Sequence, residues 1–313
     1  MSRIMDALRR AQADQLESLP ESVQRAWDGA RDFRVVTITS NKGGVGKTTI
    51  AANLATYIRA LRENDPVLIL GFDDQTMLDR IFEIDPGSER ATIAEGLLEG
   101  SLKRVARFGQ YGVEYVPTSR DLPALRRLLA GPNALRRTLL ASERSGLVVI
   151  DTKSDFENLT RASIEVADLS IVVVKDQTSL HEAERVFELL QRRDGHLSGG
   201  KILLSLMDLR VKYRDGEELD VMGHLVCEIR RAGYPLFETF ISRSPKVEAL
   251  YTNPEGRAYS ILHTANQSVV HRQMHALAGE VLALVGGDPH TGTPRSAAPA
   301  APAASAPSAI LAR

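Results

Sequence analysis

Residues 42–49 read Lys-Gly-Gly-Val-Gly-Lys-Thr-Thr, and this stretch decides the fold. The apolar run Phe33-Arg-Val-Val-Thr-Ile-Thr-Ser40 precedes it and predicts a buried strand. Residues 50–61 follow it with the apolar spacing of a helix. A strand, a glycine-rich loop and a helix, in that order, form the context in which such a loop binds phosphate. The stretch therefore predicts a nucleotide-binding α/β domain, in preference to a glycine-rich turn without a ligand.

The glycines and the second lysine of this loop have distinct expected roles. Gly43, Gly44 and Gly46 allow backbone N–H groups to turn inward around an anion, and the helix that follows adds the positive end of its dipole. Lys47 is expected to reach the β- and γ-phosphates, while the hydroxyl of Thr48 ligates magnesium. The predicted nucleotide-binding residues of the loop are Lys42, Gly43, Gly44, Val45, Gly46, Lys47, Thr48 and Thr49.

The first lysine, Lys42, distinguishes this loop from the common phosphate loop. The spacing G-x-x-x-x-G-K-[ST] requires glycine at position 41, where this chain has Asn41. The form K-G-G-x-G-K-T-T instead resembles the deviant Walker A loop of the ParA/MinD family of ATPases. The resemblance implies that Lys42 reaches across an ATP-sandwiched homodimer to the partner's phosphates, as an arginine finger does in other enzymes. It also implies ATP and Mg²⁺ as cofactors, and ATP hydrolysis that is slow until a partner protein stimulates it.

Strand-like runs alternate with helical spacing along the rest of the chain. We expect strands at 67–70, 113–116, 147–150, 170–174, 202–206 and 236–241, and a last helix at 267–285. Runs of Val, Ile and Leu separated by helices predict an α/β fold with a mainly parallel sheet flanked by helices on both faces, as in P-loop NTPases.

The chain divides into three expected parts. Residues 1–31 form an N-terminal extension with a short amphipathic helix, which Pro20 ends or interrupts. Residues 32–286 form the ATPase domain. Residues 287–313 form an Ala/Pro-rich tail that has nothing to bury and is expected to be disordered.

Two aspartates that follow apolar strands complete the expected site. Asp73 and Asp151 each stand where a strand's carboxyl end opens onto the ligand crevice of an open α/β sheet. The resemblance implies that Asp73 positions the attacking water for catalysis, together with Lys42 and Lys47. It also implies that Asp151 and Thr48 lie at the magnesium, with Asp151 binding directly or from the second shell.

Both segments depart from the family pattern. The stretch at 71–75 corresponds to the family's D-x-D-P-Q, but Gly71 and Asp74 differ from it. After Asp151 the prolines of the family are replaced, and Lys153 introduces a positive charge. Lys153 either assists nucleotide binding or points to solvent.

Later residues resemble the family more loosely. Residues 204–210 resemble the strand end that approaches the adenine, which makes Asp208 and Arg210 candidate contacts to the base or across the dimer. Arg243 and Lys246 match positions that are basic in ParA-like proteins, and Arg257 is close in sequence, so these three are the predicted DNA-binding residues. A solvated mixed-charge face is the alternative, because acids balance the basic residues between 201 and 260.

Composition and charge limit the function classes. The formal net charge of −1 gives no global attraction to nucleic acid or anionic lipid, so DNA binding requires a local patch. The single cysteine, Cys227, indicates a reducing, cytoplasmic location and is expected to be a small buried side chain. The last helix carries one arginine and no large aromatic residue, which is poor for an interfacial membrane anchor.

The resulting hypothesis is a ParA-like ATPase that dimerises on ATP, binds nonspecific DNA and positions or segregates a cargo. The cargo is a DNA locus or a protein cluster, and the ATP state is nucleoid-associated. A hydrolysis-stimulating partner is expected, and the N-terminal extension is either a docking helix for a partner or a cap on its own domain. The alternatives are a MinD-like membrane-cycling regulator and a nonhydrolysing nucleotide-dependent scaffold. A bacterial tyrosine kinase is disfavoured because the C-terminus lacks a tyrosine cluster.

Overall fold

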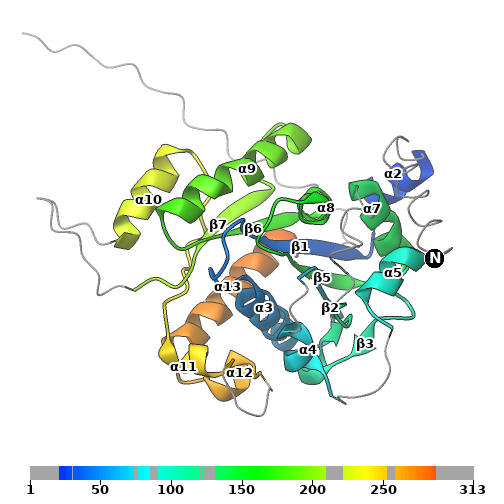
Figure 1. The fold of residues 1–313 in the computed structure, drawn as a ribbon, viewed down its shortest axis with the longest axis horizontal. Coiled ribbons are helices and arrows are strands. Elements are labelled where there is room, and N and C mark those ends of the chain that lie inside the picture. Colours follow the sequence, from blue (N-terminus) through cyan, green and yellow to red (C-terminus); the bar gives the residue numbers. More distant parts are fainter. Residues whose placement is uncertain are drawn as a thin grey trace, which may run out of the picture.

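The computed structural model describes residues 21–29, 31–73, 77–84, 91–119, 122, 131–208, 221–251 and 258–286. They form a seven-stranded sheet in the order β3-β4-β2-β5-β1-β6-β7, with helices on both faces (Figure 1). The strands are β1 Phe33–Thr39, β2 Val67–Gly71, β3 Arg107–Phe108, β4 Glu114–Tyr115, β5 Gly146–Asp151, β6 Leu169–Val174 and β7 Gly200–Leu204. Six strands are parallel, and β3 runs antiparallel to β4 at the edge. The predicted α/β fold is confirmed.

Helices cover both faces of the sheet. On one face lie α3 Lys47–Leu61, α4 Met77–Phe82, α12 Ile261–Thr264 and α13 Val269–Val285. On the other lie α5 Ile93–Glu99, α7 Pro132–Ala141, α8 Asn158–Val166, α9 Gln177–Asp194 and α10 Val221–Arg231. In β1, Val36 and Ile38 pack on the first face while Phe33 and Val35 pack on the second. Apolar residues of β1 therefore point to both faces of the sheet, because both of its sides are buried.

The register of the central strands fixes where the site lies. Asp151, the last residue of β5, is paired with Ile38 of β1 on one side and with Gly71 of β2 on the other. The carboxyl ends of β1, β2 and β5 therefore meet at one edge of the sheet. The chain leaves β1 towards β2 and later returns to β6 on the opposite side of β1, so this edge is a topological switch point.

One predicted strand is wrong. Residues 236–241 do not form a strand. This segment and Ser242 meet β7 and the residues after it through isolated bridges, Ile202 to Leu236 and Met207 to Ser242, and through a bond from the Ile241 N–H to the Leu204 carbonyl at 2.8 Å. The backbone N–H groups of Glu238 and Thr239 donate instead to the carboxylate of Glu280 in α13, at 3.0 and 2.8 Å. Since those donors are engaged by a side chain, the ladder is interrupted there.

The predicted burial of Cys227 is also wrong, because its side chain is exposed on α10. Leu225 and Ile229, four residues apart, form the buried face of this helix. A residue two positions from each of them points to the opposite side. The position of Cys227 on the helix therefore overrides the usual burial of a free cysteine.

The last described part of the N-terminal extension packs on the domain. The amphipathic helix predicted before Pro20 lies outside the described residues, and α2 spans Glu21–Asp28, directly after Pro20. Trp27 at the end of α2 is buried, and the Arg31 guanidinium lies 4.2 Å from its ring centroid. Arg31 Nη2 donates to Asp168 Oδ1 at 2.7 Å, and the other oxygen of Asp168 accepts from the N–H of Val35 at 2.8 Å. Asp168 thus joins this segment to the start of β1.

We expect Asp168→Ala to lower the free energy of unfolding by about 3 kcal/mol, because it leaves a buried guanidinium without its counter-charge. The side chains of Arg31 and Asp168 are only 8% and 10% exposed. Urea denaturation measures the change. Asp65→Ala is the matched control, since the Arg62–Asp65 pair is half exposed at 49% and 51% and its loss costs less than about 1 kcal/mol. Equal losses in the two variants would contradict the assignment.

Candidate functional site

The glycine-rich loop lies at the carboxyl end of β1 and begins α3. Gly44 and Gly46 have φ angles of 68° and 92°, a left-handed conformation that favours glycine. Val45 between them is completely buried and anchors the loop in the core. Gly46 is the N-cap of α3, so the free N–H groups of the first helical turn start at Lys47. The backbone therefore has the conformation that an anion-binding loop requires.

Lys47 is a buried cation inside this loop. Its Nζ donates to Ser154 Oγ at 2.5 Å and to the carbonyl oxygen of Lys42 at 3.3 Å. Burial lowers the pKa of Lys47, and the charges of nearby carboxylates, led by Asp151 and followed by Asp73, oppose that shift. The ammonium is thus held at the loop by neutral oxygens that a phosphate can replace.

Asp151 and Thr48 fit a magnesium site. The Asp151 side chain is 1% exposed, and among the described residues its Oδ1 has no hydrogen-bond partner. Burial raises the pKa of Asp151 to about 7, against the opposing effects of a hydrogen bond from Thr48 and the charge of Lys47. A buried carboxylate oxygen without a partner beside a hydroxyl is a donor set that suits Mg²⁺, which prefers oxygen ligands.

Asp73 belongs to the same cluster. It is half-buried two residues beyond the end of β2, and its charge acts on both Lys47 and Asp151. Gly71 is one of the two departures from the family pattern, and its surroundings are crowded. A Cβ at this position would lie 2.8 Å from Leu78 Cδ1 and 3.3 Å from Thr118 Cγ2. α4 therefore occupies the space that an aspartate at 71 would need. Asp74, the other departure, lies outside the described residues.

Three functional neighbours of the loop were missed from the sequence. Ser154 meets Lys47, and the turn between β6 and α9 contributes two more contacts. Lys42 Nζ donates to Asp176 Oδ2 at 2.7 Å, and Lys175 Nζ donates to the Gly44 carbonyl at 3.4 Å. Asp176 follows the apolar run of β6, just as Asp73 and Asp151 follow the apolar runs of β2 and β5. Its position after a strand could therefore have identified it as a residue near the ligand crevice.

The remaining predicted residues are less closely tied to the loop. Asp208 lies half-buried beyond β7, whose end approaches the loop, since a Cβ on Gly46 would be 3.4 Å from Ser205 Oγ. Thr49 is half-buried in the first turn of α3. Arg243 and Lys246 are exposed, one just before and one within α11 Pro245–Ala249. Arg210 and Arg257 lie outside the described residues.

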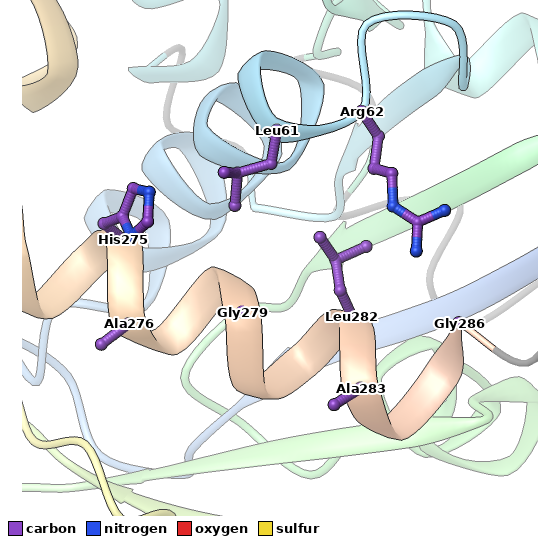
Figure 2. A pocket seen from close by; sticks show the side chains of 8 residues that line it. All are labelled: Leu61, Arg62, His275, Ala276, Gly279, Leu282, Ala283 and Gly286. Carbon is purple, nitrogen blue, oxygen red and sulfur yellow. The ribbon is translucent and has the colours of Figure 1, made fainter.

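A cavity of about 680 Å³ lies away from this cluster, between the end of α3 and α13 (Figure 2). Leu61, Arg62, His275 and Leu282 project towards it. The other lining residues of α13 are small and do not fill the space. It contains none of the loop residues. The phosphate loop itself, with its lysines and strand-end carboxylates, remains the site with the chemistry for a nucleotide.

Comparison with known proteins agrees with this geometry. Residues 33–194, more than half of the chain, match the family described as AAA domain. The chain is 28% identical over 215 residues to the chromosome-partitioning ATPase Soj of Thermus thermophilus, covering 68% of this chain and 83% of Soj. It is 28% identical over 166 residues to the antiactivator FleN of Pseudomonas aeruginosa, covering 52% of this chain and 58% of FleN.

A solved structure supports the same fold. Apo McdA of Cyanothece superposes with a TM-score of 0.61 at 18% identity, covering 80% of this chain and 99% of McdA. At that identity the likeness concerns the fold alone. The family match covers residues 33–194, which contain the loop, Asp73 and Asp151. This match and the shared fold agree with the ParA/MinD family that the two lysines of the loop predicted. The chain belongs to the ParA/MinD family of P-loop ATPases.

Proposed function

We propose that this ATPase forms an ATP-sandwiched homodimer, binds nonspecific DNA in that state and positions a cargo until a partner stimulates hydrolysis. The observation that carries the proposal is the gathering of Lys47, Asp73 and Asp151 at one edge of the sheet, with Lys42 on the same loop. A site built for binding ATP alone needs Lys47. The additional Lys42 and Asp73 are what a switch driven by hydrolysis requires.

The residues divide the work in the proposed reaction. Backbone N–H groups of Gly44 to Lys47 cradle the phosphates, and Lys47 exchanges Ser154 for phosphate oxygens. Thr48 and Asp151 would hold Mg²⁺, which would neutralise phosphate charge when bound. Asp73 accepts a hydrogen bond from the attacking water and aligns it. Lys42 of the second copy stabilises the charge that develops on the transferred phosphoryl group.

The proposed DNA surface includes Arg243 and Lys246. Arg243 Nε lies 3.0 Å from Glu248 Oε1, so one of the two charges is partly neutralised within the chain. The pair is about half exposed, and water and phosphate can therefore compete for the guanidinium. This arrangement favours weak, salt-sensitive contacts with phosphates over recognition of a base sequence.

Charge reversal at both positions, Arg243→Glu with Lys246→Glu, is expected to weaken ATP-dependent DNA binding at least about 100-fold at 50 mM salt, because each contact to phosphate contributes to counterion release. Fluorescence anisotropy on a random-sequence duplex, with ATP and Mg²⁺, measures it. ATP affinity should not change, because the loop is untouched. Glu248→Gln provides the opposite test, since it frees Arg243 and should tighten DNA binding about two- to fivefold.

Arg192→Glu is the matched control for this surface. Arg192 is an exposed arginine of α9 that pairs with Glu188. Its reversal changes the net charge in the same direction without touching the proposed surface. Arg243→Glu alone is the matched comparison, because it and Arg192→Glu change the net charge equally. If Arg192→Glu weakened DNA binding as much as Arg243→Glu, the effect would be one of net charge and the assignment of the surface would be wrong.

The cargo and partner follow from the same proposal. Soj is named a chromosome-partitioning ATPase and FleN an antiactivator, and we propose that the cargo of this chain is a DNA locus or a protein cluster. We propose a cytoplasmic, nucleoid-associated ATP state and a partner that docks at the N-terminal extension, whose described end is fixed to the domain through Trp27 and Arg31. Among the described residues, no helix has the length and apolar content to cross a membrane.

A further inference from the structure

The turn between β6 and α9 contacts the phosphate loop at two points. Asp176 Oδ2 accepts from Lys42 Nζ at 2.7 Å, and Lys175 Nζ reaches the carbonyl oxygen of Gly44 at 3.4 Å. Asp176 is itself fixed, because its Oδ1 accepts from the backbone N–H and the hydroxyl of Ser179, both at 2.9 Å. The lysine that the proposed function assigns to the second copy is therefore engaged within its own chain.

We propose that Asp176 holds Lys42 in the separate protomer and thereby restrains formation of the ATP-bound dimer. The inference rests on the proposed function, in which Lys42 acts in trans. An ammonium group that donates to the phosphates of a second copy must give up its close contact with Asp176. A triphosphate carries more negative charge than one carboxylate, so the exchange becomes favourable when the approaching copy holds ATP.

Release of Lys42 leaves Asp176 stabilised by other groups. Its Oδ1 keeps the two donors of Ser179, and it stands at the positive end of the α9 dipole. Burial by itself would raise the pKa of Asp176, but the hydrogen bonds from Lys42 and Ser179 outweigh it and lower the pKa. The two hydrogen bonds from Ser179 do not involve Lys42, so they continue to favour the ionised carboxylate after Lys42 leaves.

The ion pair between Lys42 and Asp176 is weak enough to break when the dimer forms. The side chains of Lys42 and Asp176 are 29% and 37% exposed, so water can reach both partners and screen their attraction. A pair of this kind shifts an equilibrium by up to about fivefold. Asp176 is thus a positioning residue for Lys42, and its effect is on assembly more than on the chemical step.

Asp176→Asn removes the negative charge of residue 176 but keeps the side-chain oxygen that caps α9. Asparagine is as good an N-cap as aspartate, so the contacts with Ser179 persist while the ion pair is lost. Ser179→Ala is the matched control, because it removes the hydroxyl from the cap and leaves the contact between Lys42 and Asp176 in place. Both variants are made in the full chain.

Two measurements test the inference. In the first, without nucleotide, acetylation of Lys42 by an N-hydroxysuccinimide ester is followed by mass spectrometry, with buried Lys47 as the internal reference. We expect Lys42 to react about two- to fivefold faster in Asp176→Asn, and as in the wild type in Ser179→Ala. In the second, sedimentation with ATP and Mg²⁺ should show a dimer dissociation constant about three- to tenfold lower for Asp176→Asn, with a difference that shrinks as salt is added.

Each outcome decides the matter. Faster acetylation together with a tighter ATP dimer supports the restraint. Unchanged acetylation of Lys42 shows that Asp176 does not hold it, which overturns the inference and leaves the proposed dimer intact. Faster acetylation with an unchanged or weaker dimer also overturns it, since Asp176 would then assist Lys42. If the wild type does not dimerise on ATP at all, the proposed function fails and the restraint on assembly fails with it.

Discussion

Lys42→Ala is expected to reduce ATP hydrolysis by about 10³-fold or more, since analogous charges supplied in trans contribute 10³ to 10⁵ in rate. ATP affinity should stay within about threefold of the wild type, because Lys47 is the cation that the loop buries. The variant loses only the pair with Asp176, which is partly exposed, so its fold should be retained. Hydrolysis is measured as phosphate release at protein concentrations where the wild type dimerises, and ATP affinity by titration calorimetry.

Lys42→Arg is the conservative control. It keeps the positive charge but replaces a compact ammonium by a planar fork, so partial activity is expected. A Lys42→Ala protein that hydrolyses ATP at the wild-type rate under these conditions would refute the role assigned to this lysine.

Asp73→Ala is expected to reduce hydrolysis by about 10²- to 10⁴-fold, because the attacking water loses the group that aligns it. ATP binding should persist, and the variant should accumulate as an ATP-bound dimer on DNA, since the step that dissolves the dimer is blocked. Gel filtration with ATP and anisotropy on DNA measure both effects. Asp155→Ala is the matched control, because Asp155 is a nearby carboxylate whose Oδ1 accepts from Thr160 and the Glu157 N–H at the start of α8.

A mixture of the two inactive proteins tests the trans arrangement directly. In a mixed dimer, the Lys42→Ala copy keeps Asp73 and receives Lys42 from the Asp73→Ala copy, so one of its two sites is complete. Random pairing should restore about a quarter of the wild-type rate. No restored activity in a mixture that forms dimers would mean that Lys42 and Asp73 act within one chain.

Much of the fold and of the site could be predicted from the sequence. The loop at 42–49 was identified because consecutive residues form it, and the left-handed angles of Gly44 and Gly46 agree with the glycines' expected role. Asp73 and Asp151 were predicted because parallel strands bring their carboxyl ends together. Both lie near Lys47 in the structure.

Other features could not be predicted, for reasons that involve residues distant in sequence. Residues 236–241 have the apolar content of a strand, but Glu280 of α13 binds two of their N–H groups. Gly71 departs from the family pattern because Leu78 of α4 fills the space beside it. In both cases the deciding contact comes from a separate helix, and no local pattern reports it.

The phosphate loop, the parallel sheet and the class of chemistry could be predicted from the residues alone, because each depends on short-range spacing. Tertiary structure alone decided what the two lysines meet. Lys42 pairs with Asp176, 134 positions away, and Lys47 with Ser154, 107 positions away. Such contacts depend on β6 and β5 lying on either side of β1. Strand order and register, set by burial of both faces of the sheet, bring these residues within hydrogen-bond distance.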